Sequence, residues 1–381
     1  MMDAIGVMRI TRREWLLGSL ALGACGRKKA TGFPGYALVS TAGENSLAVV
    51  DLTVFQLVRQ IGLEAAPAMV LSASESSFAM TPETGSVHVI DRALTRVSSH
   101  RLADELSAIQ LTPDEKRLLA ISSASREVIL VDSASMKVIR RHKLEGPPTS
   151  LDVALTSYAA VSTGSQGAVE LFHLETGRNW RARIQGKIGA VRFRADGELL
   201  LAANLRDQSL TALNVPALQV VADLPLAMQP ENLCFNSDAG QLFVSGDGMD
   251  AIAIVFPYDT LEVEQTVLAG RDPGVMACSA NPAYLFVASH SGSDVCILDV
   301  DSRKVIGIVE VGQKPAYIKV TPDNQYALVL NELSGDMAVI RVTAISRSSK
   351  ANRTMSGATL FNMIQVGSKP IHAAIVSKQL V

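Results

Sequence analysis

The sequence contains few of the motifs that indicate a function directly. Its 381 residues carry a formal net charge of −2, so no excess of basic residues points to a nucleic-acid partner. It lacks a glycine-rich phosphate loop, a His-Glu-x-x-His motif and a Gly-x-Ser-x-Gly nucleophile elbow. No pair of cysteines has the spacing of metal ligands. We therefore expect no metal and no cofactor, and no catalysis is evident from the motifs.

Cysteine is also scarce, with four residues in the whole chain. Cys234, Cys278 and Cys296 fall in segments that we predict to be strands, and their spacing shows no pairing. Their number is odd, which argues against a set of disulfides. We expect all three to be small buried apolar residues, with no role as disulfide partners or metal ligands.

The sequence does have an internal repeat. A short apolar run recurs along the chain, and in four copies the residue directly after it is Asp. The residues at this position are Asp51, Asp91, Asp132, His173, Asn214, Phe256, Asp299 and Arg341. Asp51 and Asp91 are 40 residues apart, and the widest pair, Phe256 and Asp299, is 43 apart. Each unit contains four strand-length runs separated by turn residues and shows no helical periodicity. Solenoid units of this length are mostly helical, so repeated four-stranded units predict an all-β propeller in which each unit forms one blade.

The number of inner strands predicts the number of blades. These strands begin near Pro67, Leu106, Pro148, Ile188, Pro230, Pro273, Pro315 and Pro370. We predict eight four-stranded antiparallel blades, with seven as the alternative if one weak repeat is not a blade. The chain opens at Tyr36 with the second strand of a blade, so we expect the C-terminal strand 371–376 to close that first blade. Residues 342–359 are predicted to be an exposed, mobile insertion in the last blade.

The clearest unit resembles the YVTN-type β-propeller repeat. The residues that match are Pro315, Thr321-Pro322-Asp323, Leu328-Val329-Leu330-Asn331, Ile297-Leu298-Asp299 and Val311-Gly312. The resemblance covers about residues 35–376 and implies the fold, but surface-layer, lactonase-like and cytochrome-like members leave the function open. With two tryptophans the chain lacks the Trp-Asp ending of WD-repeat blades and the docking motif of quinoprotein propellers. It also lacks a Cys-x-x-Cys-His haem attachment motif.

The N-terminus predicts export. Arg12 and Arg13 precede an apolar stretch that runs to Ala24, which is typical of a signal peptide and too short for a permanent membrane span. The twin arginine resembles a Tat signal, and Leu22-Gly23-Ala24-Cys25 resembles a lipobox in which Cys25 is lipidated. We predict a signal peptide at 1–24, a tether at 25–34 and a propeller at 35–381. The alternative is a buried N-terminal helix that contains a cysteine.

Equivalent positions of the blades form rings around the axis, and these rings supply the candidate site. We expect Arg192 and Lys319 inside the inner strands, and the candidate residues at the channel mouth are Lys187, Lys314, Lys369, His290 and His372. The lysines and the arginine would form a cationic funnel for an anionic ligand. The rings also contain Glu105, Asp152 and Asp272, so the alternative is that the charges pair across the channel and hold water. Each histidine is either a metal ligand or base, or a structural hydrogen-bonding residue.

These observations predict an extracytoplasmic protein, in the periplasm or at the cell surface, held at a membrane by its N-terminal lipid. Its predicted function is a binding scaffold for a protein, a peptide or a small anionic ligand. One form of this hypothesis is a maturation partner for another exported complex. The alternative is a propeller enzyme, either a lactonase-like hydrolase or a cofactor-dependent oxidoreductase, because propeller sites are assembled from distant blades and need no local motif.

Overall fold

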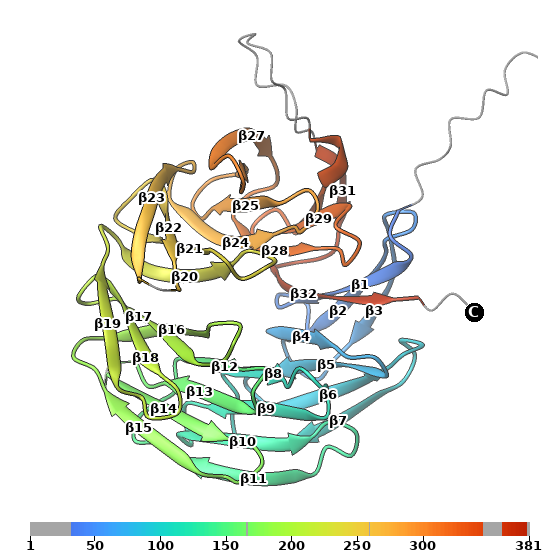
Figure 1. Cartoon of the computed structure of the whole chain (residues 1–381). Coiled ribbons are helices and arrows are strands. Elements are labelled where there is room, and N and C mark those ends of the chain that lie inside the picture. The colour runs from blue at the N-terminus through green and yellow to red at the C-terminus, as the bar shows by residue number, and fades with distance from the viewer. Residues whose placement is uncertain (1–31, 165–166, 259, 346–359, 379–381) are drawn as a thin grey trace, which may run out of the picture.

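The computed structural model describes residues 32–164, 167–258, 260–345 and 360–378. This part of the chain forms eight four-stranded antiparallel sheets, arranged as blades around a common centre (Figure 1). The prediction of eight blades is confirmed, and the alternative of seven is wrong. The predicted signal peptide, residues 25–31 of the tether and Cys25 lie outside the described residues. In the described part, no helix is long and apolar enough to span a membrane.

The strands fall into four concentric layers (Figure 1). The innermost strands are β4 (Met69–Ser72), β8 (Ala108–Leu111), β12 (Ser150–Val153), β16 (Ile188–Phe193), β20 (Gln229–Phe235), β24 (Pro273–Cys278), β28 (Pro315–Val320) and β32 (Pro370–Ser377). The second strands are β1 (Gly35–Thr41), β5 (Ser76–Thr81), β9 (Arg117–Ser122), β13 (Tyr158–Ser162), β17 (Leu199–Asn204), β21 (Leu242–Asp247), β25 (Tyr284–Ser289) and β29 (Tyr326–Asn331).

The two outer layers complete each blade. The third strands are β2 (Ser46–Asp51), β6 (Ser86–Asp91), β10 (Glu127–Asp132), β14 (Ala168–His173), β18 (Ser209–Asn214), β22 (Ala251–Phe256), β26 (Asp294–Asp299) and β30 (Asp336–Arg341). The outermost strands are β3 (Gln56–Gly62), β7 (Val97–Arg101), β11 (Val138–Lys143), β15 (Asn179–Arg183), β19 (Val220–Pro225), β23 (Glu262–Leu268), β27 (Lys304–Glu310) and β31 (Leu360–Gln365).

The apolar runs of the sequence become the second and third strands, which are buried on both faces. Every residue of β29 is buried, whereas β3 is exposed along almost its whole length. Each blade packs its apolar faces against the two neighbouring blades, as where Val39 of β1 and Leu328 of β29 share a cluster. Full burial of one such side chain stabilises the fold by about 1.5–3 kcal/mol. The core is therefore a set of interfaces between blades.

The ring closes through the pairing of the two ends of the chain. Strand β32 lies antiparallel to β1, with Tyr36 opposite Val376 and Ser40 opposite His372. Strand β32 is thus the innermost strand of a blade whose other three strands come from the N-terminus. This confirms the prediction that the C-terminal strand closes the first blade. We call this blade one and number the others in chain order, from blade two (β4–β7) to blade eight (β28–β31).

The predicted insertion has the expected place, between β30 and β31, but two of its first residues are buried, while Thr343 and Ala344 between them are exposed. Val342–Ala344 forms a short 3-10 helix, and Val342 and Ile345 are buried among the apolar residues between blades seven and eight. Their burial follows from their apolar side chains, so the expectation of exposure is wrong there. Residues 346–359 lie outside the described part of the chain.

Candidate functional site

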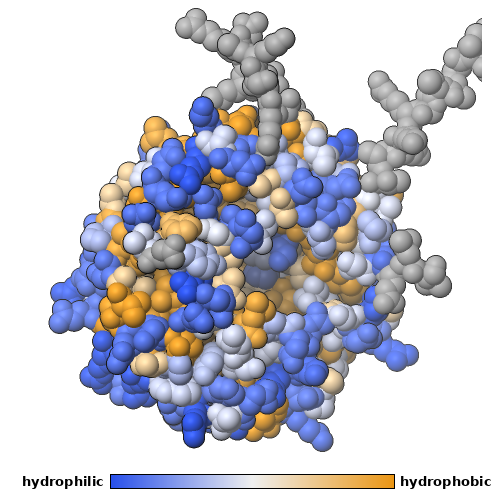
Figure 2. Space-filling view, viewed as in Figure 1, coloured by the Kyte–Doolittle hydropathy of each residue, from blue (hydrophilic) through white to orange (hydrophobic). Residues whose placement is uncertain are grey.

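The inner strands surround a cavity of about 720 Å³. Its walls come from six blades, through β32, β4, β8, β12, β16 and β28. Figure 2 shows this side of the molecule hollowed at its centre, with hydrophilic residues deep in the hollow. The volume is in the range of small-molecule binding sites, so the cavity is the candidate functional site.

The lining of the cavity combines an apolar wall with a few polar groups. Successive residues of a strand point in opposite directions, which explains which side chains line the cavity. Val191 and Ile318 pack between blades, so the residues that follow them, Arg192 and Lys319, line the cavity. The apolar wall includes Met69, Leu71, Ala108, Ile109 and Leu111. The polar and aromatic groups are Gln110, Asp152, Arg192, Tyr317, Lys319 and His372.

Asp152 is the hub of one half of this polar set. Its Oδ1 accepts a hydrogen bond from Nε2 of Gln110 at 3.2 Å, and its Oδ2 accepts one from the backbone N–H of Phe193 at 2.8 Å. Nη1 of Arg192 lies 3.6 Å from Oδ1. Burial raises the pKa of Asp152, although the charge of Arg192 and the hydrogen bonds act to lower it. The carboxylate thus links three consecutive inner strands, β8, β12 and β16.

Lys319, Tyr317 and His372 form the other half. The rings of Tyr317 and His372 lie 4.3 Å apart, centroid to centroid, at an interplanar angle of 34°. Burial raises the pKa of Tyr317 to about 12, so its hydroxyl keeps its proton. The side chain of Lys319 opens into the cavity but has protein around it, and this desolvation lowers its pKa. Among the described residues, no carboxylate lies within ion-pair distance of its ammonium.

His372 is neutral in this environment. The backbone N–H of Val70 donates to its Nδ1 at 3.3 Å, so Nδ1 is an acceptor and the ring proton lies on Nε2. Burial, and then the positive charge of Lys319, lower the pKa of His372 to about 4. The histidine therefore provides a hydrogen-bond donor inside the cavity and carries no charge at neutral pH.

The other predicted site residues lie in loops and do not line the cavity. Lys187 and Lys369 are exposed just before β16 and β32, and His290 is exposed after β25. Lys314 precedes β28 and its Nζ lies 2.8 Å from Oε2 of Glu332. The structure thus brings Arg192, Lys319 and His372 to one cavity and leaves Lys187, Lys314, Lys369 and His290 outside it.

The ring charges pair at one place and not at another. Arg192 is paired with Asp152 across neighbouring strands, while Lys319 has no such counter-ion in the described chain. Sequence reasoning missed Tyr317, although its position two residues before Lys319 on a strand predicts that the two share a face.

The cysteines correct a second expectation. Cys296 is buried, as predicted. Cys234 and Cys278 are only partly buried, and their Sγ atoms lie 3.9 Å apart on the neighbouring strands β20 and β24. The expectation that these two are buried holds only in part, and both are free thiols in contact with each other. Their separation of 44 residues, close to one repeat, was the signal that places them at similar heights on successive blades.

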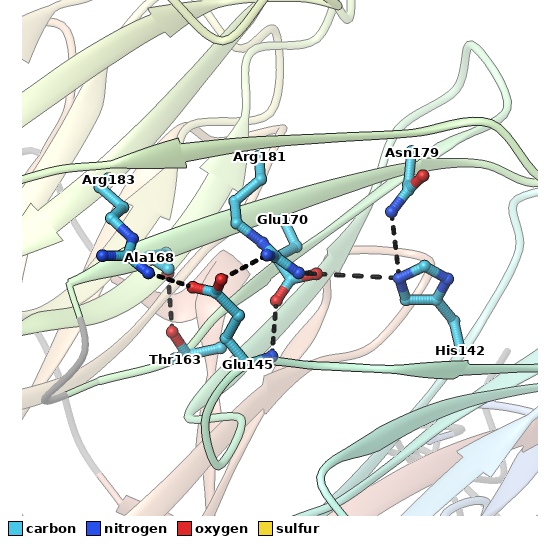
Figure 3. A network of polar contacts seen from close by, with 8 residues as sticks. All are labelled: His142, Glu145, Thr163, Ala168, Glu170, Asn179, Arg181 and Arg183. Carbon is cyan, nitrogen blue, oxygen red and sulfur yellow. Dashed lines mark hydrogen bonds and ion pairs between the residues drawn. The ribbon is translucent and has the colours of Figure 1, made fainter.

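A separate polar network lies between blades three and four (Figure 3). The side chain of Glu170 is fully buried, and it accepts hydrogen bonds from Nη2 of Arg181 at 3.0 Å and from the backbone N–H of Glu145 at 3.1 Å. Glu145 in turn pairs with Arg181 at 2.6 Å and with Arg183 at 3.0 Å. Nε2 of His142 lies 3.8 Å from Glu170 and 3.2 Å from Nδ2 of Asn179. Because both oxygens of Glu170 are engaged, we interpret this network as a structural link between blades.

Comparisons with known proteins agree on the fold. No family model matches the chain. A seven-bladed β-propeller protein of Mycobacterium tuberculosis is 25% identical over 149 residues, a match that spans 38% of this chain and 38% of that protein. The matched segment is therefore well under half of either protein.

Solved structures resemble the chain over most of its length. A dihydro-haem d1 dehydrogenase, NirN, in complex with DHE has a TM-score of 0.75 at 12% identity, covering 90% of this chain and 75% of that one. Apo AztD from Citrobacter koseri has a TM-score of 0.66 at 12% identity, covering 90% and 97%. A putative 6-phosphogluconolactonase from Bacteroides fragilis has a TM-score of 0.59 at 15% identity, covering 92% and 99%. At such identities the likeness establishes the propeller fold alone.

The buried histidine generates a prediction about acid stability. The unfolded His372 gains a proton near pH 6.5 and the folded one only near 4, so acid favours the unfolded chain in that window. Between pH 7 and 4.5, the wild type should lose about 2 kcal/mol more unfolding free energy than His372→Gln. Urea titrations at both pH values measure this difference. Equal losses in the two proteins would contradict the burial of a neutral histidine.

The network around Glu170 generates a second prediction. Glu170→Leu removes the acceptor for Arg181 and for the Glu145 N–H, and should lower the unfolding free energy by about 2–4 kcal/mol. The matched control is Glu175→Gln, which removes an exposed partner of Arg117 and should leave the unfolding free energy nearly unchanged. Urea denaturation followed by circular dichroism compares the two. A similar cost for both would show that the network does not stabilise the blade contact.

Proposed function

We propose that the chain is an exported, lipid-anchored β-propeller that binds a small anionic ligand in its central channel. The observation that carries this proposal is the ammonium of Lys319, which opens into the cavity and has no counter-ion among the described residues. Lys319 is exposed to the cavity, and the surrounding protein desolvates it only in part. An anion that reaches its ammonium there gains a charge-assisted hydrogen bond.

The rest of the lining supports an anion with an apolar or aromatic body. Arg192 and Lys319 outnumber Asp152, the acidic side chain of the lining, so the cavity has a positive excess. The stacked pair of Tyr317 and His372 offers an aromatic surface beside Lys319. Leu71 on the neighbouring strand β4 and the other apolar residues of the lining offer contacts without polar requirements. A carboxylate, phosphate or sulfonate on a small hydrophobic molecule satisfies all three features.

The state of the acid–base groups supports binding over turnover. Asp152 already accepts two hydrogen bonds and faces Arg192, and Nδ1 of His372 is occupied by a backbone N–H. Neither group is left free to take a proton from a substrate. The alternative of a hydrolase or an oxidoreductase draws on the enzyme names of two structural neighbours, whose identity of 12–15% supports the fold alone.

Two features support the proposed membrane attachment: the N-terminal motif around Cys25, and the contacts that hold Gly32 and Phe33 against the propeller. The N–H of Gly32 donates to the carbonyl of Thr53 at 3.2 Å, and Phe33 is buried between the first and last blades. Residue 32 is therefore fixed to blade one. The seven residues from a lipidated Cys25 to this point span at most about 25 Å. Such a tether would keep the propeller next to the membrane surface.

The anion proposal predicts the effect of removing the unpaired charge. The probe is 1-anilinonaphthalene-8-sulfonate, an aromatic sulfonate whose fluorescence rises in apolar sites. Lys319→Met keeps the length and removes the charge, and should raise the Kd of the probe by about tenfold.

The matched control is Lys187→Met, which removes an exposed lysine outside the cavity and should leave the Kd within about twofold. Fluorescence titration with each protein gives the constants, and circular dichroism checks the fold. Equal Kd values for the wild type and Lys319→Met would refute binding at the channel lysine.

If a lipid on Cys25 anchors the protein, substitution of this cysteine should move the protein from the membrane fraction to the soluble fraction. In membranes from its own host, the wild type should sediment with the lipid and remain there after a high-salt wash. Cys25→Ser removes the acylated atom and should move the protein to the soluble fraction. Cys296→Ala, a change at a buried cysteine of β26, is the control and should stay with the membrane. Retention of Cys25→Ser in the washed membrane would overturn the assignment.

A further inference from the structure

Cys234 and Cys278 form a thiol pair at the inner layer of the propeller. Cys234 lies on β20 of blade six and Cys278 on β24 of blade seven, with their Sγ atoms 3.9 Å apart. Both are free thiols and both are partly exposed. Strands β20 and β24 belong to different sheets, so no ladder of backbone hydrogen bonds fixes the distance between them.

The surroundings make the two thiols unequal. The hydrogen bond with Cys278 lowers the pKa of Cys234, and the positive charge of Arg192 on blade five lowers it further, against the effect of burial. The same hydrogen bond and burial raise the pKa of Cys278 well above its usual range. Either thiol can donate in this contact, and the positive charge of Arg192 favours the thiolate on Cys234. A thiolate beside a cation is the reactive form of cysteine.

Cys296 shows how a structural cysteine in the same fold differs. It lies in β26, is 1% exposed and packs in the apolar cluster between blades six and seven. Burial, with a smaller effect of Asp294, raises its pKa to about 12. It has neither a thiol partner nor a neighbouring cation among the described residues. The pairing of Cys234 with Cys278 is thus a specific feature of the inner strands.

We propose that Cys234 and Cys278 form a thiol–disulfide exchange site that reacts with small disulfides. The thiolate of Cys234 attacks one sulfur of the disulfide, whose S–S bond breaks and whose other sulfur leaves and takes a proton. Cys278 then loses its proton and attacks Cys234, which releases the second thiol and leaves a Cys234–Cys278 disulfide. Two electrons and two protons pass from the protein to the small disulfide, which becomes two thiols.

The final bond requires only a local movement. The Sγ atoms are 3.9 Å apart, so an S–S bond of about 2.05 Å needs them to approach by about 2 Å, a distance within the reach of side-chain rotation. The two cysteines lie on strands that do not line the anion cavity, and the two sites share only Arg192. Substitution of either cysteine leaves Lys319 in place, so failure of the thiol exchange would leave the anion proposal standing.

The first experiment measures thiols in the folded protein. The full chain with Cys25→Ser keeps Cys234, Cys278 and Cys296 as its thiols. It is incubated with excess oxidised glutathione and then blocked with N-ethylmaleimide, and its intact mass is compared with that of an untreated sample. The treated protein should carry two fewer maleimide groups than the untreated sample. Its digest should contain a disulfide-linked peptide pair with Cys234 and Cys278. Unchanged labelling of the folded protein, with reaction only in urea, would overturn the proposal.

Single substitutions separate the two roles and keep the test decisive. In the same background, Cys278→Ser should stop at one glutathione bound to Cys234, and Cys234→Ser should bind none. Cys296→Ala should behave as the unsubstituted background. In the unsubstituted protein at neutral pH, iodoacetamide should alkylate Cys234 at least about tenfold faster than Cys296. Equal rates at the two cysteines, or glutathione on Cys296 in place of Cys234, would contradict the assignment of Cys234 as the nucleophile.

Discussion

The pairing of β32 with β1 is the interaction on which the rest of the structure depends. The second and third strands of a blade are apolar on both faces, so a blade is stable only with a neighbour on each side. A ring meets this requirement only when its last blade contacts its first, and the cluster that joins them contains Tyr326 and Ile375. The same closure builds the candidate site, because it brings Lys319 of blade eight beside His372 of the C-terminal strand.

The channel has two halves with different chemistry. Along blades three to six, polar groups of the inner strands interact in series: Gln110 contacts Asp152, Asp152 faces Arg192, and the charge of Arg192 acts on Cys234. Along blades eight and one, Lys319 faces an aromatic pair and lacks a counter-ion in the described chain. The paired groups explain why a charged channel is compatible with a stable fold. Beside Lys319, a bound anion would add most to the stability of the protein.

The repeat predicted the fold in detail, because each copy repeats the same strand and turn chemistry. The predicted starts of the inner strands lie within two residues of the observed ones, as at Pro148 for β12, which begins at Ser150. The site was predicted only in part. Strand alternation placed Arg192 and Lys319 correctly, but side-chain pairing depends on distances between blades, which a one-dimensional period does not contain. The contacts of Lys314 with Glu332 and of Cys234 with Cys278 are of this kind.

The central claim is that the channel holds a small anion against Lys319. The most direct test is native mass spectrometry of the mature protein purified from its own host, together with metal and chromophore analysis. The wild type should carry one small anionic molecule per chain, and Lys319→Met prepared in the same way should have lost it. A bare chain, or a molecule retained equally by both proteins, would contradict the claim.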